Sequence, residues 1–209
     1  MNKITELVFI LDKSGSMAGK EDDSIGGFNA MIESQKGEEG QALVSTILFS
    51  NSSQVIHDRK PIDLMQPLTR EDYVVGGATA LIDAIGWAIN HIRTIHKYAR
   101  EEDRPEKTIF IITTDGMENA SRQFTSSQVK EMIKTQQETF GWEFLFLAAN
   151  LDAVETAEII GINSNRMANY NEKPMDMVFC DVSKEIKYFR KMGKVRNTWA
   201  EDIEKKEKP

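Results

Sequence analysis

Cysteine and positive charge are both scarce in this 209-residue sequence, and each shortage argues against a class of function. Cys180 is the only cysteine, which excludes an internal disulfide and a cysteine-based zinc site. The 26 lysines and arginines are outnumbered by 33 acidic residues, so the formal net charge is -7. A chain of this kind lacks the basic surface that nucleic-acid binding requires, and we expect no nucleic-acid partner.

Long apolar runs are also missing. No segment approaches the roughly 20 apolar residues needed to span a bilayer, and the opening MNKITELVFIL has no small-residue cleavage site. We therefore expect no membrane association and a cytoplasmic location. The remaining composition, 40% hydrophobic and 28% charged, is typical of one globular domain with a full core.

Short apolar segments bounded by polar residues predict the strands of a buried sheet. The four strongest are segments 6–11, 42–50, 107–114 and 142–149. Segment 53–58 is weaker, and it follows its predecessor closely enough to predict a hairpin. A short last strand is expected near residues 166–170.

Helical periodicity fills the intervals between these strands. Apolar residues recur at helical spacing over 81–95, 129–140, 154–160 and 178–189. Thr125 or Ser126 is the expected cap of the second of these helices. Strands that alternate with helices predict an α/β protein whose parallel sheet is covered by helices on both faces.

Other features refine this outline. We expect one domain over 1–195 and a charged helical extension over 196–209, with an apolar stripe of Val195, Trp199 and Ile203 at this end of the chain. The glycine pairs Gly26–Gly27 and Gly76–Gly77 predict loops near helix starts. Cys180 falls in an apolar helical pattern and is predicted to serve packing.

Polar side chains gather after the predicted strands, where a parallel sheet collects its binding groups. Asp12, Ser14 and Ser16 follow the first strand in the stretch DKSGSM, at alternate positions. Asp115 follows the strand 107–114, and Thr79 precedes the helix that begins near residue 81. We expect these loops to converge on one edge of the sheet.

The five side chains are all hard oxygen donors, with three hydroxyls and two carboxylates among them. This donor set suits Mg²⁺ or Mn²⁺, whereas Ca²⁺ normally takes more ligands and more carboxylate. If the aspartates act through waters while the hydroxyls ligate directly, the positive charge of the ion is poorly quenched. Such an ion should attract a carboxylate from a partner protein.

The same residues carry a family resemblance. The stretches DKSGSM, GGATALIDAI and TTDGMENAS resemble the three metal-binding loops of the von Willebrand factor type A domain. The metal-ion-dependent adhesion site of that family has Asp-x-Ser-x-Ser in the first loop, a threonine in the second and an aspartate in the third. All five positions are matched here, and the similarity extends from the first strand to the late helix.

The resemblance implies a fold and a role. The fold would be Rossmann-like, with three α/β/α layers and about six strands, one of them an antiparallel edge strand. Ser14, Ser16 and Thr79 would be direct or switchable metal ligands, and Asp12 and Asp115 would hold coordinated waters. The chain looks most similar to small stand-alone cytoplasmic members from bacteria or phages. Some intracellular relatives work beside AAA-type ATPases or in metal-resistance assemblies, which are the kinds of partner implied.

A rim of further residues is expected to contact the partner. It comprises Gly77, Met117, Glu118, Asn119, Asn150 and Asp152. Two purely structural roles are alternatives to partner binding at these positions. Glu118 and Asn119 would equally suit a hydrogen-bonded loop, and Asn150 or Asp152 would equally suit a helix cap.

Two other functions stay open at this point, although we expect no enzyme. A metal-dependent phosphohydrolase would use Asp12 as nucleophile, but Ser14 stands where its second acid is needed. A serine hydrolase would need Gly-x-Ser-x-Gly, which SGSMAG does not supply. An interaction domain with a vestigial metal loop is the remaining alternative, and the intact set of five residues argues against it.

Overall fold

A single six-stranded sheet forms the centre of the computed structural model, which describes residues 4–171 and 173–204. The strands are β1 (Ile4–Asp12), β2 (Gln41–Phe49), β3 (Ser53–Pro61), β4 (Lys107–Thr114), β5 (Glu143–Ala148) and β6 (Met167–Asn169). Their order across the sheet is β3-β2-β1-β4-β5-β6. All neighbours are parallel except β2 and β3, which pair antiparallel at one edge. The predicted mostly parallel sheet and its edge hairpin are confirmed.

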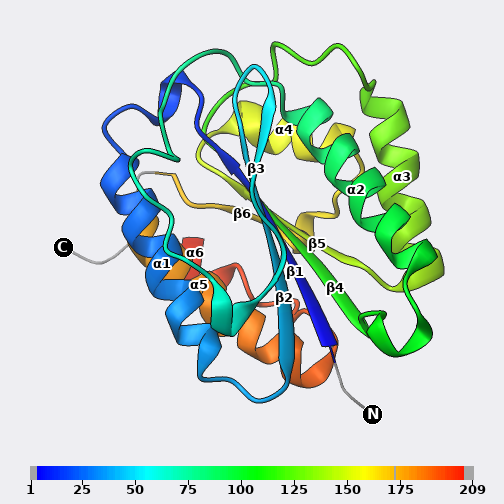
Figure 1. Cartoon of the computed structure of the whole chain (residues 1–209). Helices are drawn as coiled ribbons and strands as arrows, with labels where there is room; N and C mark the ends of the chain where they lie inside the picture. Colours follow the sequence, from blue (N-terminus) through cyan, green and yellow to red (C-terminus); the bar gives the residue numbers. More distant parts are fainter. Residues whose placement is uncertain (1–3, 172, 205–209) are drawn as a thin grey trace.

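Helices cover both faces of the sheet (Figure 1). They are α1 (Glu21–Lys36), α2 (Leu81–Tyr98), α3 (Ser126–Phe140), α4 (Leu151–Ile159), α5 (Met175–Met192) and α6 (Glu201–Glu204). One apolar core lies between the sheet and α1 and α5, and a second lies between the opposite face and α2, α3 and α4. Among the described helices, none has the length and apolar character needed to cross a membrane.

The apolar runs become central strands because both faces of the sheet are covered. All nine residues of β1 are buried, as are the apolar residues of β4 and β5. A strand in this position has no solvent face, so its sequence does not alternate. The edge strand β3 is largely exposed, which explains its weaker sequence signal.

The chain order fixes where a ligand site forms. After β1 the chain continues to β2 and β3 on one side, and then returns to β4 on the other side of β1. The carboxyl ends of β1 and β4 therefore mark the point at which the strand order reverses, and crevices in open α/β sheets lie at such points. Asp12 ends β1, and Asp115 directly follows β4.

Local capping agrees with the sequence at α3. Thr125 accepts a hydrogen bond from the backbone N–H of Gln128, and the Gln128 side chain accepts from the N–H of Thr125. This reciprocal capping box satisfies two donors that the first helical turn leaves free. Thr125, one of the two predicted caps, is the residue used.

The expectation that Gly26 and Gly27 form a loop is wrong, because both lie inside α1. Gly27 faces α5, where an added Cβ would come within 2.7 Å of the Cα of Asp176. The glycine therefore serves close packing between the two helices. The prediction that Cys180 serves packing is also wrong, because its side chain lies on the exposed side of α5.

The described part of the C-terminal segment packs on the body of the protein. Val195, Trp199 and Ile203 are buried against the core formed by α1 and α5. The indole N–H of Trp199 donates to the carbonyl of Asn165 at 2.9 Å. The predicted apolar stripe is therefore used within the chain. Residues 205–209 of the expected extension lie outside the described residues, and the boundary at residue 195 stays a prediction.

Candidate metal centre

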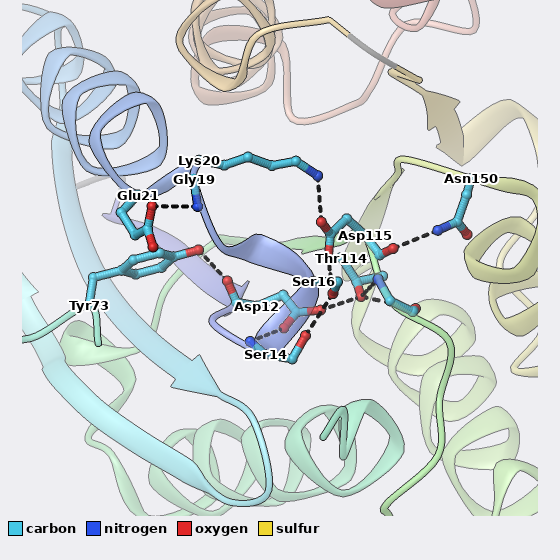
Figure 2. A network of polar contacts seen from close by, with 11 residues as sticks. Asp12, Ser14, Ser16, Gly19, Lys20, Glu21, Tyr73, Thr114, Asp115 and Asn150 are labelled. Carbon is cyan, nitrogen blue, oxygen red and sulfur yellow. Dashed lines mark hydrogen bonds and ion pairs between the residues drawn. The ribbon is translucent and has the colours of Figure 1, made fainter. Parts of the chain in front are cut away.

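Asp12 is held rigidly at the end of β1 (Figure 2). Its Oδ1 accepts from the backbone N–H of Ser14 at 2.7 Å, and its Oδ2 accepts from the hydroxyl of Thr114 at 2.6 Å. The phenol of Tyr73 donates to the Asp12 carbonyl. The side chain is only 1% exposed, and this burial raises the pKa of the carboxyl despite the two hydrogen bonds. A cation nearby would offset the cost of keeping it ionised.

The two serine hydroxyls link this strand end to Asp115. Ser14 Oγ and Ser16 Oγ lie 3.1 Å apart, and Ser16 Oγ donates to Asp115 Oδ1 at 2.5 Å. Ser16 belongs to the short 3-10 turn Gly15–Met17, which folds the loop back over the strand ends. Ser14 is buried while Ser16 is exposed, so the site opens to solvent on the Ser16 side.

Thr79 completes the set from the connection before α2. A Cβ placed on Gly116 would lie 2.7 Å from Thr79 Oγ1, 3.2 Å from Ser16 Oγ and 3.5 Å from Ser14 Oγ. Three hydroxyls from two separate stretches of chain therefore lie close to one point beside the backbone of Gly116. The five predicted residues do come together, and their oxygens fit a hard divalent cation.

The donor set differs from a carboxylate-rich site. Within residues 4–171 and 173–204, no group of three or more His, Cys, Asp or Glu side chains is placed to hold a metal ion. Asp12 and Asp115 contribute two charges, and neutral hydroxyls supply the other oxygens. This composition suits Mg²⁺ or Mn²⁺ better than Ca²⁺ or Zn²⁺. Metal binding by these residues stays a prediction.

Three further residues of the site were not identified from the sequence. Thr114 orients Asp12, Tyr73 fixes its carbonyl, and the Lys20 ammonium lies 2.5 Å from Asp115 Oδ2. A threonine pair at the end of the apolar run KTIFIITT was a usable signal for Thr114. Lys20 and Tyr73 carry no such signal, because only the folded chain brings them to the strand ends.

Glu118 and Asn119 are engaged in the loop after β4. The Glu118 carboxylate accepts from the N–H groups of Ile82, Ala120 and Ser121 at 2.8 to 3.0 Å. Asn119 Oδ1 accepts from the backbone N–H of Thr79 at 2.9 Å. Both side chains thus hold the second and third loops together and fix the position of Thr79.

The remaining rim residues differ in their accessibility. Asn150 caps α4 through the N–H of Ala153 and donates to the Asp115 carbonyl at 2.5 Å. The carbonyl of Gly77 accepts from the N–H of Gly15 at 3.0 Å. Met117 and Asp152 are exposed. A partner-binding role for this rim stays a prediction.

Replacing Lys20 with glutamine is expected to raise Mn²⁺ affinity about threefold. The ammonium and a divalent cation would both neutralise Asp115, so they compete for the same carboxylate. Lys20 is 43% exposed, so solvent screens the pair and its contribution is only a fraction of a kcal/mol. Isothermal titration calorimetry measures the change. Lys13→Gln is the matched control, since it removes a charge from the same loop without touching Asp115. Equal or lower affinity in Lys20→Gln than in Lys13→Gln would contradict the competition.

Comparison with known proteins supports the fold. No family model matches the sequence, and no curated protein matches it either. Solved structures match throughout most of the chain. The von Willebrand factor domain of the type V pili tip protein Mfa5 from Porphyromonas gingivalis has a TM-score of 0.65 and 10% identity, over 94% of this chain and 99% of that one.

Two further solved structures also match the fold of this chain. The ArnB paralog VWA2 from Sulfolobus acidocaldarius gives a TM-score of 0.57 and 14% identity, over 88% of this chain and 45% of that one. Manganese-loaded TRAP protein from Plasmodium vivax gives a TM-score of 0.54 and 15% identity, over 81% of this chain and 69% of that one. The chain spans less than half the length of several solved chains that it matches. At these identities the likeness establishes the fold of von Willebrand factor type A domains.

Proposed function

We propose that this chain, which has the fold of von Willebrand factor type A domains, is a metal-dependent protein-binding module. One observation carries the proposal: the hydroxyls of Ser14, Ser16 and Thr79 lie close to one point beside Gly116, and the Ser16 hydroxyl bonds to Asp115. That arrangement lies at the reversal of strand order, where ligand sites of open α/β sheets form.

Each residue has a distinct role in this proposal. Ser14, Ser16 and Thr79 would hold Mg²⁺ or Mn²⁺ through neutral oxygens, while Asp12 and Asp115 balance its charge. When bound, the cation supplies a position that accepts an oxygen from outside the chain. Thr114 keeps Asp12 oriented at the end of β1 by its hydrogen bond.

The proposed partner is a protein that presents an Asp or Glu side chain. If Asp12 and Asp115 act through waters while the hydroxyls ligate directly, the positive charge of the ion is poorly quenched, and an anionic oxygen from a partner would then bind it favourably. Ser16 and Met117 are exposed beside the site, so a partner side chain can approach from this direction. A cytoplasmic AAA-type ATPase or metal-resistance assembly is the setting that the family resemblance implies.

Binding without turnover fits these residues better than phosphoryl transfer does. Both oxygens of Asp12 accept hydrogen bonds, and the side chain is buried, so it is a poor nucleophile. Ser14 occupies the position where a phosphohydrolase of similar design would need its second acid. We therefore propose that the chain is not an enzyme.

The proposal is tested by affinity capture with the purified chain in parallel buffers that contain Mg²⁺ or EDTA. The expected result is a partner that is retained only with Mg²⁺ and is lost with Ser14→Ala. Ser127→Ala, which removes an exposed hydroxyl on α3, is the matched control. Changing the key acid of the captured partner to its amide should abolish retention. Unaltered capture after that change would reject the carboxylate bridge, and turnover of a generic phosphoester would favour the enzymatic alternative.

Substitution of Thr79 by valine is expected to weaken Mn²⁺ binding about tenfold while the free energy of unfolding changes by less than about 0.5 kcal/mol. Valine keeps the buried volume and removes only the hydroxyl that lies beside Gly116. Calorimetric titration and thermal unfolding measure the two quantities. A large loss of stability with unchanged metal affinity would assign Thr79 a structural role.

A further inference from the structure

A cavity of about 540 Å³ lies beside the amino ends of β4 and β5. The candidate metal centre lies at the other end of the strands, at their carboxyl ends. The walls of the cavity come from the last turns of α2 and α3 and from the connection between α2 and β4, which Figure 1 shows at the lower right. This volume is within the range that proteins use for small organic ligands.

Aromatic rings form much of the cavity wall. Trp142 is almost fully buried, stacks on Phe110 with ring centroids 5.3 Å apart and touches the His96 ring edge-on at 5.4 Å. These contacts fix the orientation of the indole. Phe140 and Tyr98 also line the cavity, and their side chains are 60% and 76% exposed. A flat ring could therefore pack against a rigid indole and bury exposed aromatic surface.

The cavity is positively charged although the whole protein is acidic. Arg93, Lys97 and Arg104 line it, against the single carboxylate of Glu106. In the part of the chain that the structure describes, none of these three cations forms an ion pair. An anionic group on a ligand would find charge complementarity here, in a protein whose net charge is -7.

A buried amide adds a specific requirement. Gln136 lines the cavity with only 2% of its surface exposed, and its Oε1 has no hydrogen-bond partner. Leaving a buried acceptor unpaired costs on the order of 1–3 kcal/mol, so such atoms normally have a partner. A ligand with an N–H or O–H on its ring would supply the missing donor once the Gln136 amide turns toward the cavity.

We propose that this cavity binds a small aromatic anion, a flat ring with a hydrogen-bond donor and an acidic group. The ring packs on Trp142, the ring donor bonds to Gln136, and the acidic group lies among Arg93, Lys97 and Arg104. Nucleotide monophosphates and indole carboxylates share this chemistry. The site is separate from the candidate metal centre, so binding requires no divalent cation.

The test uses the full chain labelled with ¹⁵N and titrated in EDTA with two probes, AMP and indole-3-acetate. The Trp142 indole resonance, assigned by its loss in Trp142→Phe, reports occupancy. At least one probe is expected to bind with a Kd below about 1 mM, and binding should weaken as salt is raised. Adenosine and inorganic phosphate, which carry the ring or the charge alone, should each bind at least about tenfold more weakly. The stronger probe distinguishes a phosphate from a carboxylate ligand.

Two variants separate this site from general surface attraction. The double variant Arg93→Gln, Lys97→Gln is expected to weaken binding about tenfold, whereas Lys134→Gln, an exposed lysine on α3 outside the cavity, leaves it unchanged. Gln136→Leu should weaken indole-3-acetate about tenfold but leave naphthalene-1-acetate, which has no ring donor, unaffected.

Several results would overturn this inference. Failure of both probes to shift the Trp142 resonance at 5 mM, about five times the expected Kd, would do so. So would phosphate binding as tightly as AMP, or equal effects of Lys134→Gln and the double variant. Binding that requires Mg²⁺ would place the ligand at the candidate metal centre instead. The first three of these results do not bear on the proposed metal-dependent function.

Discussion

Replacing Gly116 with alanine is expected to abolish divalent-cation binding while the protein stays folded. The new methyl group would lie 2.7 Å from Thr79 Oγ1 and 3.2 Å from Ser16 Oγ, at the point on which the hydroxyls converge. The backbone of Gly116 is not in the positive-φ region, so alanine adds no backbone strain there. We expect Mn²⁺ affinity to fall at least about 100-fold, which is close to 3 kcal/mol. Titration calorimetry measures this loss.

Gly26→Ala is the matched control for that experiment. It adds the same methyl group on α1, where an added Cβ meets no atom within 4 Å. Its Mn²⁺ affinity should equal that of the unmodified chain, and the free energy of unfolding should rise by up to about 1 kcal/mol because alanine favours helix. Normal Mn²⁺ binding by Gly116→Ala would show that the cation, if bound at all, lies elsewhere.

Asp12→Asn is expected to stabilise the metal-free protein and to remove metal binding. Asparagine keeps Oδ1 as acceptor for the Ser14 N–H. Its Nδ2 would face the Thr114 hydroxyl and donate a hydrogen bond to it. The hydroxyl would then turn and donate to the Gly116 carbonyl, which lies 3.3 Å away. The hydrogen bonds are thus retained while a buried charge is removed. We expect a gain of about 1 kcal/mol in the free energy of unfolding at pH 7 and a loss of Mn²⁺ affinity of at least about 30-fold.

The pH dependence of stability provides an independent check. Burial raises the pKa of Asp12 above its ordinary value of 3.8, so the folded state holds this proton more tightly than the unfolded state does. Stability due to this group therefore falls as pH rises from about 3.8 through the raised pKa, and it is constant above that window. Denaturant unfolding across this range should show the unmodified chain losing stability relative to Asp12→Asn.

Glu138→Gln is the matched control for this comparison, because it removes one exposed carboxylate from α3. Its stability should follow that of the unmodified chain at every pH. If Asp12→Asn were less stable than the unmodified chain at pH 7 without metal, the carboxylate would be contributing to the fold. The interpretation that the buried Asp12 carboxylate lowers stability when no cation is bound would then be wrong.

The strands were the most predictable part of the fold. Segment 107–114 coincides with β4, and the other three strong segments agree with β1, β2 and β5 to within one or two residues at most ends. Buried parallel strands leave a continuous apolar run that needs no tertiary information to be seen. The first helix was the main element not assigned from the sequence, because its glycine pair was interpreted as a loop.

That helix shows why local patterns fail at some positions. Glycine is unfavourable inside a helix, and Gly26–Gly27 alone predicts a break. Gly27 is tolerated because its missing side chain lets the backbone of α5 approach. Cys180 illustrates the converse, since its apolar neighbours predicted burial while the rotation of α5 places it on the exposed side. Both outcomes depend on contacts between segments about 150 residues apart.

The amino-acid order by itself determined the alternation of strands and helices, and it placed Asp12, Ser14, Ser16, Thr79 and Asp115 next to strand or helix ends. It could do so because hydrophobic periodicity and loop position are local properties of the chain. Only the folded arrangement decided that three hydroxyls surround one point beside Gly116, that Lys20 reaches Asp115, and that Thr114 orients Asp12. It also created the cavity beside the last turns of α2 and α3, which Arg93, Lys97 and Arg104 line. These features depend on distances between remote segments, which the order of β1 and β4 in the sheet sets.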